Sequence, residues 1–132
     1  MSAHDLLMRR ALKLAENSFY ISDPNPRVGC VIARDGAIIA EGWTQRAGEA
    51  HAEIHALQKI DFTCVDADIY VSLEPCSHIG RTGPCVDAII SARPSRVFIA
   101  MRDPNPVVNG VGIQKLRSAG IEVVENVCAV ES

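Results

Sequence analysis

The sequence is poor in aromatic residues, has no excess of positive charge and contains no long apolar run. Phe, Trp and Tyr make up 5% of its 132 residues, and 13 Lys and Arg stand against 16 Asp and Glu, which gives a net charge of -3. Proteins that bind nucleic acid use basic surfaces and stacking aromatic side chains, so this composition predicts no nucleic-acid partner. Without about 18 consecutive apolar residues, the sequence also predicts no membrane-spanning helix and no membrane partner.

Cysteine is present, but in a number that does not suit a disulfide framework. The five cysteines are Cys30, Cys64, Cys76, Cys85 and Cys128, and an odd number leaves one thiol unpaired. The first 18 residues contain no apolar stretch long enough for a signal peptide. Both observations favour a reducing compartment and predict a cytoplasmic protein. Cys30, Cys64 and Cys128 are expected to be small, buried apolar residues.

The remaining composition is typical of a folded globular protein. Hydrophobic residues make up 48% of the chain and charged residues 22%, close to the average of soluble domains. A chain of 132 residues has the length of one domain. We therefore expect a single domain over residues 1–132.

Periodicity and turn signals predict helices that alternate with strands. Apolar residues at helical spacing predict a first helix over residues 4–18. Asp35-Gly36 predicts a tight hairpin turn, because both residues accept positive φ angles. The expected strands are 27–34, 37–43, 67–73, 96–101 and 121–124, and the further helices are 51–60, 85–91 and 113–119. This order predicts a three-layer α/β/α sandwich around a mixed sheet of about five strands.

One group of residues has the composition of a catalytic zinc site. His51 and Glu53 lie at the start of a predicted helix. Cys76 follows a predicted strand, and Cys85 lies near the start of the next helix. One imidazole and two thiols are zinc ligands, and three protein ligands leave the fourth position of a tetrahedral ion for water. Glu53 then remains to move a proton from that water to a leaving group, as in zinc-dependent deaminases.

Two other histidines leave a structural zinc site open as an alternative. His55 lies four residues after His51, and His78 lies between the two candidate cysteines. Either histidine could be a fourth ligand, which would close the ion to water. We favour a packing or supporting role for His55, because a catalytic site needs the open position. The order His-Ala-Glu-Ile-His differs from the His-Glu-x-x-His of metalloproteases, so a protease is a poor interpretation.

Four segments of the sequence carry a family resemblance. They are 25–30 (NPRVGC), 47–53 (AGEAHAE), 73–85 (LEPCSHIGRTGPC) and 101–106 (MRDPNP). Together they resemble the deaminase domain of the riboflavin-biosynthesis deaminase/reductase, within the cytidine-deaminase-like superfamily. Most members of that superfamily separate the two zinc cysteines by only two residues. The longer segment 77–84 is similar to that of the riboflavin branch.

The resemblance implies a zinc-dependent reaction on a small phosphorylated aminopyrimidine. The reaction is the hydrolytic removal of the 2-amino group of 2,5-diamino-6-(5-phosphoribosylamino)pyrimidin-4(3H)-one. The resemblance further implies that His51, Cys76 and Cys85 hold Zn2+ and that Glu53 transfers the proton. It also suggests that the protein is a homo-oligomer, either a dimer or a tetramer.

The same resemblance suggests which residues contact the substrate. Asn25 matches the family position that contacts the pyrimidine, and His78 and Arg81 lie in the segment that faces the substrate. Arg81 is suited to a phosphate or a ring carbonyl, because its guanidinium is always charged and carries several donors. Thr44 occupies the position where the family has a substrate-contacting histidine.

The sequence departs from the family pattern near these residues. Besides Thr44, Ala50 replaces a proline before the zinc histidine, Ile79 replaces a second histidine, and Gly83 replaces a proline. None of the departures falls on a predicted zinc ligand. We therefore expect intact zinc chemistry, with effects of these positions on substrate choice or rate.

The family usually continues into a reductase domain after a strand such as 121–124. The present chain ends seven residues after Glu125, at Ser132. The sequence is therefore expected to hold the deaminase without the reductase, either as a stand-alone protein or as a piece of a longer one. The reductase would then be supplied elsewhere.

Two classes of alternative remain open at this point. The first is a deaminase of another base or nucleoside, such as cytosine, guanine or a tRNA adenosine, although few aromatics and an acidic balance do not favour nucleic acid. The second is a zinc-binding scaffold domain without catalytic activity. Measuring the ammonia released from each candidate amine distinguishes the first alternative from the riboflavin deaminase. Replacement of Glu53 by Gln distinguishes the second, because a scaffold would keep its function and an enzyme would lose most of its deamination.

Overall fold

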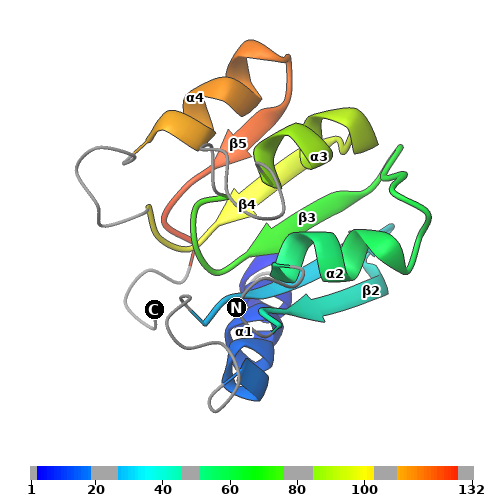
Figure 1. The fold of residues 1–132 in the computed structure, drawn as a ribbon, viewed down its shortest axis with the longest axis vertical. Coiled ribbons are helices and arrows are strands. Elements are labelled where there is room, and N and C mark those ends of the chain that lie inside the picture. Colours follow the sequence, from blue (N-terminus) through cyan, green and yellow to red (C-terminus); the bar gives the residue numbers. More distant parts are fainter. Residues whose placement is uncertain (1–2, 19–26, 46–50, 76–84, 103–109, 128–132) are drawn as a thin grey trace.

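The structure, a computed structural model, describes residues 3–18, 27–45, 51–75, 85–102 and 110–127. The helices in these residues are α1 (Ala3–Ala15), α2 (Ala52–Gln58), α3 (Cys85–Ala92) and α4 (Val111–Ser118), and a 3-10 turn, η1 (Glu16–Ser18), follows α1 (Figure 1). The strands are β1 (Gly29–Arg34), β2 (Ala37–Trp43), β3 (Asp68–Val71), β4 (Arg96–Ile99) and β5 (Glu122–Val124). Each element expected from the sequence is present, with ends that differ by a few residues.

The strands form one mixed sheet in the order β2-β1-β3-β4-β5. β1 pairs antiparallel with β2 and β3, whereas β3, β4 and β5 are parallel to one another. The β1–β2 hairpin turns at Asp35 and Gly36, whose φ angles of 54° and 80° are the positive values that its turn type requires. The predicted mixed sheet and the predicted hairpin are both confirmed.

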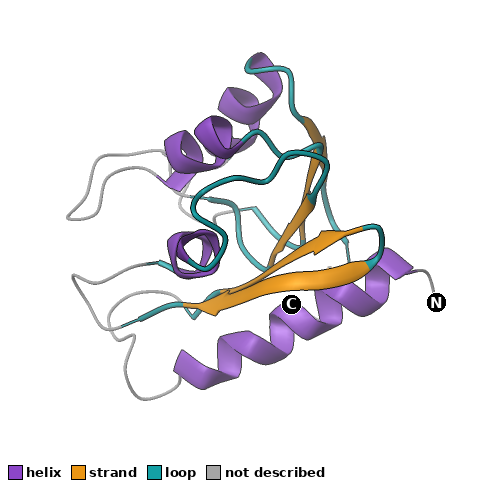
Figure 2. Cartoon of the chain, turned by 90° about the vertical axis from the view of Figure 1, so that its right-hand side faces the viewer, coloured by secondary structure: helices purple, strands orange, loops and turns teal. Residues whose placement is uncertain are grey.

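The helices cover the two faces of the sheet unequally. Figure 2 shows α1 along one face and the other helices on the opposite side of the strands. α1 packs on a cluster that includes Met8, Tyr70 and Phe98, and a second cluster, with Leu57 and Ile89, fills the space under α2, α3 and α4. This arrangement confirms the three-layer sandwich. Among the described residues, no helix is long and apolar enough to cross a membrane.

Two glycines allow helices to pack unusually close to the strands. A β-carbon on Gly29 of β1 would lie 1.7 Å from the Ala11 carbonyl oxygen of α1. A β-carbon on Gly42 of β2 would lie 2.3 Å from the Ala52 carbonyl oxygen of α2. Both distances are far below any normal contact, so only glycine fits at either position. Gly42 thus sets the depth at which the start of α2 meets the sheet.

Candidate metal and catalytic site

The candidate site lies at the edge of the sheet where β3 ends. Val71, the last residue of β3, pairs with Cys30 near the start of β1, and Cys30 in turn pairs with Gly42 near the end of β2. Gly42 lies against Ala52, so the start of α2 packs at this same edge of the sheet. The carboxyl ends of parallel strands are where open α/β sheets place their ligands.

Two of the predicted zinc ligands meet at this edge. His51 immediately precedes α2, Cys85 is the first residue of α3, and the His51 Nδ1 atom lies 3.1 Å from Cys85 Sγ. A tetrahedral zinc ion, with bonds of about 2.0–2.1 Å to nitrogen and about 2.3 Å to sulfur, sets such atoms about 3.6 Å apart. Cys85 is buried at a helix N-terminus, where the helix dipole favours a thiolate. The donor types therefore fit a zinc ion, and the two atoms lie at hydrogen-bonding distance, closer together than such an ion would hold them.

Glu53, the predicted proton-transfer residue, is buried at the start of α2. It lies in the first turn of α2, two residues after His51, and is only 4% exposed. Burial, and then the charges of Glu53 and Cys64, raise the pKa of Cys30 well above its usual value. Cys30 is therefore a neutral thiol close enough to Glu53 to sense its charge. The Glu53 side chain is thus shielded from bulk water on the side of β1 and α2.

The His55 ring contacts Trp43, the last residue of β2. Its Nδ1 atom accepts a hydrogen bond from the Trp43 backbone N–H (3.2 Å) and lies 3.1 Å from the Gln45 side-chain nitrogen. The ring also meets the Trp43 ring edge to face at 4.7 Å. Burial, and then the charge of Lys59, lower the pKa of His55, so its imidazole is a neutral acceptor at neutral pH. These contacts support the packing role expected for His55.

Thr44 is hydrogen-bonded to the backbone of Val28 near the candidate site. Thr44 is buried, and its hydroxyl accepts a hydrogen bond from the Val28 backbone N–H at 3.0 Å. The Thr44 backbone N–H donates to the Val28 carbonyl, also at 3.0 Å. Thr44 thus ties the end of β2 to the residue before β1. A contact between Thr44 and the substrate stays a prediction.

Four predicted site residues lie outside the described residues. They are the third zinc ligand, Cys76, and the substrate contacts Asn25, His78 and Arg81. In the part of the chain that the structure does describe, no group of three or more His, Cys, Asp or Glu side chains is placed to hold a metal. The pair of His51 and Cys85 is therefore the described portion of the predicted ligand set.

Sequence reasoning missed one buried group at the same edge, Glu74. This residue is 4% exposed, and its carboxylate accepts hydrogen bonds from backbone N–H groups at the start of α4. The available signal was a glutamate directly after the apolar strand and directly before Pro75. A carboxylate in that position is buried with the strand and must find donors there.

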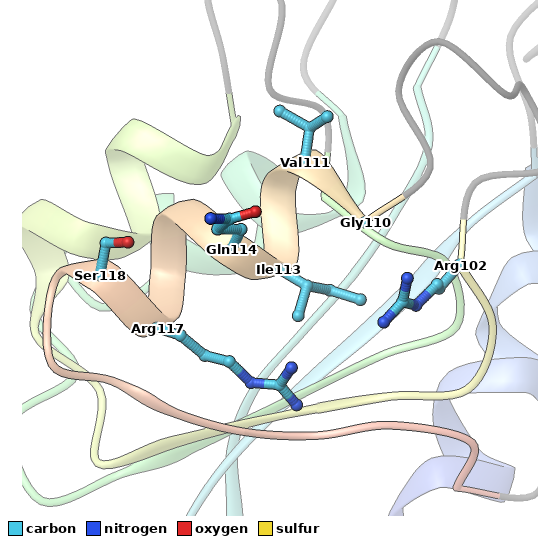
Figure 3. Close-up of a pocket in the computed structure, with 7 residues that line it drawn as sticks. All are labelled: Arg102, Gly110, Val111, Ile113, Gln114, Arg117 and Ser118. Carbon is cyan, nitrogen blue, oxygen red and sulfur yellow. The ribbon is translucent and has the colours of Figure 1, made fainter.

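A pocket among the described residues lies along α4. It has a volume of about 550 Å3 and is lined by Arg102, Gly110, Val111, Ile113, Gln114, Arg117 and Ser118. Arg102 points toward the first turn of α4, and Arg117 extends from its last turn (Figure 3). Both guanidinium groups donate to Glu125. Neither His51 nor Cys85, the two described candidate ligands, is among the residues that line it.

The match to a family model defines the class of protein. Residues 1–101 match the model described as the cytidine and deoxycytidylate deaminase zinc-binding region. The chain therefore belongs to this family of deaminases. The membership confirms the superfamily predicted from the sequence motifs, and it agrees with a site built from an imidazole and a buried thiol.

Several of the similar proteins are named as riboflavin biosynthesis proteins or as a pyrimidine deaminase. The chain is 44% identical over 125 residues to the diaminohydroxyphosphoribosylamino-pyrimidine deaminase of Buchnera aphidicola, an alignment that covers 95% of the chain and 85% of the relative. It is 55% identical over 116 residues to the riboflavin biosynthesis protein RibD of Escherichia coli, covering 88% of the chain and 32% of that protein. The chain thus spans about a third of the length of its RibD relatives.

Solved structures give the same result. RibD of Acinetobacter baumannii superposes with a TM-score of 0.91 at 43% identity, over 97% of this chain and 36% of the other. The Rib2 deaminase of Aspergillus oryzae, solved in complex with DARIPP, superposes with a TM-score of 0.72 at 26% identity, over 94% of this chain and 85% of the other. These matches confirm the cytidine-deaminase-like fold and the resemblance to the riboflavin branch.

Proposed function

We propose that this chain catalyses the hydrolytic deamination of 2,5-diamino-6-(5-phosphoribosylamino)pyrimidin-4(3H)-one in riboflavin biosynthesis. The observation that carries the proposal is the likeness to the Buchnera deaminase, which the chain covers over 85% of its length at 44% identity. That relative is named for the deaminase reaction alone. The Aspergillus Rib2 deaminase, a protein of similar fold, was solved in complex with DARIPP, which adds support.

In this proposal, His51, Cys76 and Cys85 hold one zinc ion. The description of the family as a zinc-binding region supports the choice of metal, and the His51–Cys85 distance of 3.1 Å supports two of the ligands. When bound, zinc supplies a Lewis acid that makes water nucleophilic near neutral pH. Cys76 completes the ligand set by its place in the sequence, directly after Glu74 and Pro75.

Glu53 moves the protons of the reaction. Water adds to the ring carbon that bears the 2-amino group, and the C–N bond of that carbon breaks to release ammonia. The Glu53 carboxylate accepts the proton that the water loses and donates it to the departing amine, so the residue ends the cycle ionised. Its position two residues from His51 and its 4% exposure support this role.

The substrate contacts follow from the resemblance and stay part of the proposal. Asn25 binds the pyrimidine, and His78 and Arg81 face the substrate, with Arg81 offering charge to a phosphate or a ring carbonyl. The Thr44 hydroxyl already accepts a hydrogen bond from the Val28 backbone. A substrate contact made by the Thr44 O–H would compete with the 3.4 Å hydrogen bond that it donates to the Val28 carbonyl.

The proposal also covers the assembly and location of the protein. We expect a homo-oligomer, a dimer or a tetramer, in the cytoplasm. The RibD relatives are about three times as long as the matched region, so the reductase that acts with this deaminase is either joined to it or supplied as another protein.

A substrate panel tests the proposed function. Zinc-loaded protein is incubated with the diaminopyrimidine phosphate, cytosine, cytidine, guanine and an adenosine-containing tRNA stem-loop, and the ammonia released from each is measured. We expect turnover of the diaminopyrimidine phosphate and none of the others. Turnover of cytidine or guanine, with none of the diaminopyrimidine, would overturn the assignment. Ammonia from none of the substrates, with zinc bound, would favour the scaffold alternative.

Replacement of Cys85 by Ser tests the zinc site directly. A serine hydroxyl is a poor zinc ligand, so we expect Cys85→Ser to reduce the bound metal from about one zinc per chain to well below half under the same dialysis conditions. Metal analysis after dialysis provides the measurement. Cys64→Ser is the matched control, because Cys64 is an equally buried free thiol away from His51. Equal zinc content in the two variants would exclude Cys85 as a ligand.

A further inference from the structure

Glu74 is a buried carboxylate that lies between β3 and the predicted zinc ligand Cys76 in the sequence. It follows β3 by three residues, precedes Pro75 and Cys76 in the sequence, and is only 4% exposed. A buried carboxylate is costly unless hydrogen bonds replace its hydration. Its partners therefore define how this part of the chain must be arranged.

The Glu74 carboxylate accepts three backbone hydrogen bonds from the start of α4. Its Oε1 atom accepts from the Gly110 N–H at 2.9 Å, and its Oε2 atom accepts from the N–H groups of Gly112 at 2.9 Å and Ile113 at 3.3 Å. These N–H groups belong to the first turn of a helix, where the backbone has no helical acceptor to offer. A negative side chain there is also favoured by the helix dipole.

The backbone of Glu74 is fixed as well. Its N–H donates to the Met101 carbonyl, just after β4, at 2.9 Å. On the other side, a β-carbon on Gly112 would lie 2.5 Å from the Pro75 carbonyl oxygen, so α4 approaches the Glu74–Pro75 backbone as closely as glycine permits. Side chain, main chain and close packing together hold this short segment against β4 and α4.

We propose that Glu74 is a positioning residue for the zinc site, because it fixes the point from which the chain continues to Cys76. The inference rests on the proposed function, in which Cys76 is a zinc ligand. Only Pro75 separates Glu74 from Cys76 in the sequence, so the anchored Glu74 backbone is the nearest fixed point before that cysteine. Groups that orient metal ligands typically change metal affinity about 10- to 100-fold when they are removed.

A purely structural role makes a different prediction. If Glu74 only caps α4, its replacement lowers the stability of the protein but leaves the metal ligands unchanged in the folded molecule. Zinc affinity of the folded protein and the spectrum of a bound metal separate the two roles. Neither quantity is moved by a loss of stability that leaves the protein folded.

The test uses Glu74→Gln, which keeps the size of the side chain but replaces one acceptor oxygen by a donor that opposes the α4 N–H groups. Glu74→Ala is a second variant, and Glu125→Gln is the matched control, because Glu125 binds Arg102 and Arg117 without contacting the start of α4. Zinc affinity is measured by competition with a chromophoric chelator. Thiolate coordination is measured from the absorption of the cobalt(II)-loaded protein, and thermal unfolding of the zinc-free protein is recorded alongside.

We expect Glu74→Gln to lower zinc affinity roughly tenfold or more and to weaken the thiolate–cobalt absorption, with Glu125→Gln within twofold of the original protein. Zinc affinity within twofold in a folded Glu74→Gln protein, with an unchanged cobalt spectrum, would overturn the proposal. If Glu74→Ala does not fold, Glu74→Gln decides alone.

A further measurement separates this inference from the proposed function. If the original protein binds no zinc, the proposed function has failed, and the positioning role is judged from the alkylation rate of Cys76 in zinc-free protein, followed by peptide mass spectrometry. A faster rate in Glu74→Gln than in the original protein, with an unchanged rate in Glu125→Gln, supports the positioning role. Equal rates in all three overturn it.

Discussion

Replacement of Glu53 by Gln is expected to abolish most deamination while the protein keeps its fold and its zinc. Gln has the same size but cannot accept and return a proton, so the turnover rate is expected to fall roughly 10²- to 10⁴-fold. Glu53 is not one of the predicted ligands, and its neighbour His51 remains beside Cys85. The measurement is ammonia release under saturating substrate, with zinc content and circular dichroism on the same samples.

Glu122→Gln provides the control for this experiment. Glu122 is an exposed residue of β5, which is separated from β1 by β3 and β4 in the sheet. Its replacement by Gln removes the same negative charge as Glu53→Gln. It is expected to retain full activity. A Glu53→Gln protein with activity within about threefold of the original would remove Glu53 from the mechanism. A Glu53→Gln protein without zinc would show that the carboxylate acts on the metal site instead.

Replacement of Gly42 by Ala is expected to disturb both the fold and the zinc site. The new β-carbon would lie 2.3 Å from the Ala52 carbonyl oxygen and 2.6 Å from the Ala56 backbone nitrogen. These are backbone atoms, so no change of rotamer relieves the clash and α2 must move. Overpacking of this kind costs about 3 kcal/mol of unfolding free energy. Because Ala52 lies between His51 and Glu53, zinc affinity is also expected to fall roughly tenfold.

Gly29→Ala separates loss of stability from displacement of the site. Gly29 faces α1, on the opposite side of the sheet, and its β-carbon would lie 1.7 Å from the Ala11 carbonyl oxygen. We expect at least as large a loss of unfolding free energy in denaturant titrations, with zinc affinity of the folded protein close to normal. Equal loss of zinc affinity in both variants would mean that general instability, not movement of α2, weakens the site.

The parts of the fold that depend on neighbouring residues could be predicted from the sequence. The hairpin at Asp35-Gly36 is one example, because its positive φ angles are a local requirement that Asp and Gly meet. The burial of Cys30 and Cys64 is another, because a cysteine without a chemical partner behaves as a small apolar residue. The close approach of α2 to Gly42 could not be predicted. It depends on how a helix later in the chain packs against the strand, and the residues around Gly42 do not specify that packing.

The same limit applies to the site. His51 and Cys85 could be predicted because zinc accepts few donor types, and the structure brings the two side chains together across 34 positions. Glu74 could not, because its role depends on N–H groups of α4, 36 or more residues further along the chain. The lowered pKa of His55 likewise depends first on the burial of its ring and then on the charge of Lys59, and the burial is set by packing between elements.

The contact between Glu74 and α4 also bears on where this domain can be divided. The family model matches residues 1–101, which end before α4 begins. A chain shortened to that match would keep the Glu74 carboxylate but lose the three N–H groups that replace its water. It would also lose β5, which borders β4. The smallest unit that supplies hydrogen-bond donors to the buried Glu74 carboxylate therefore extends through α4, beyond the region that matches the family model.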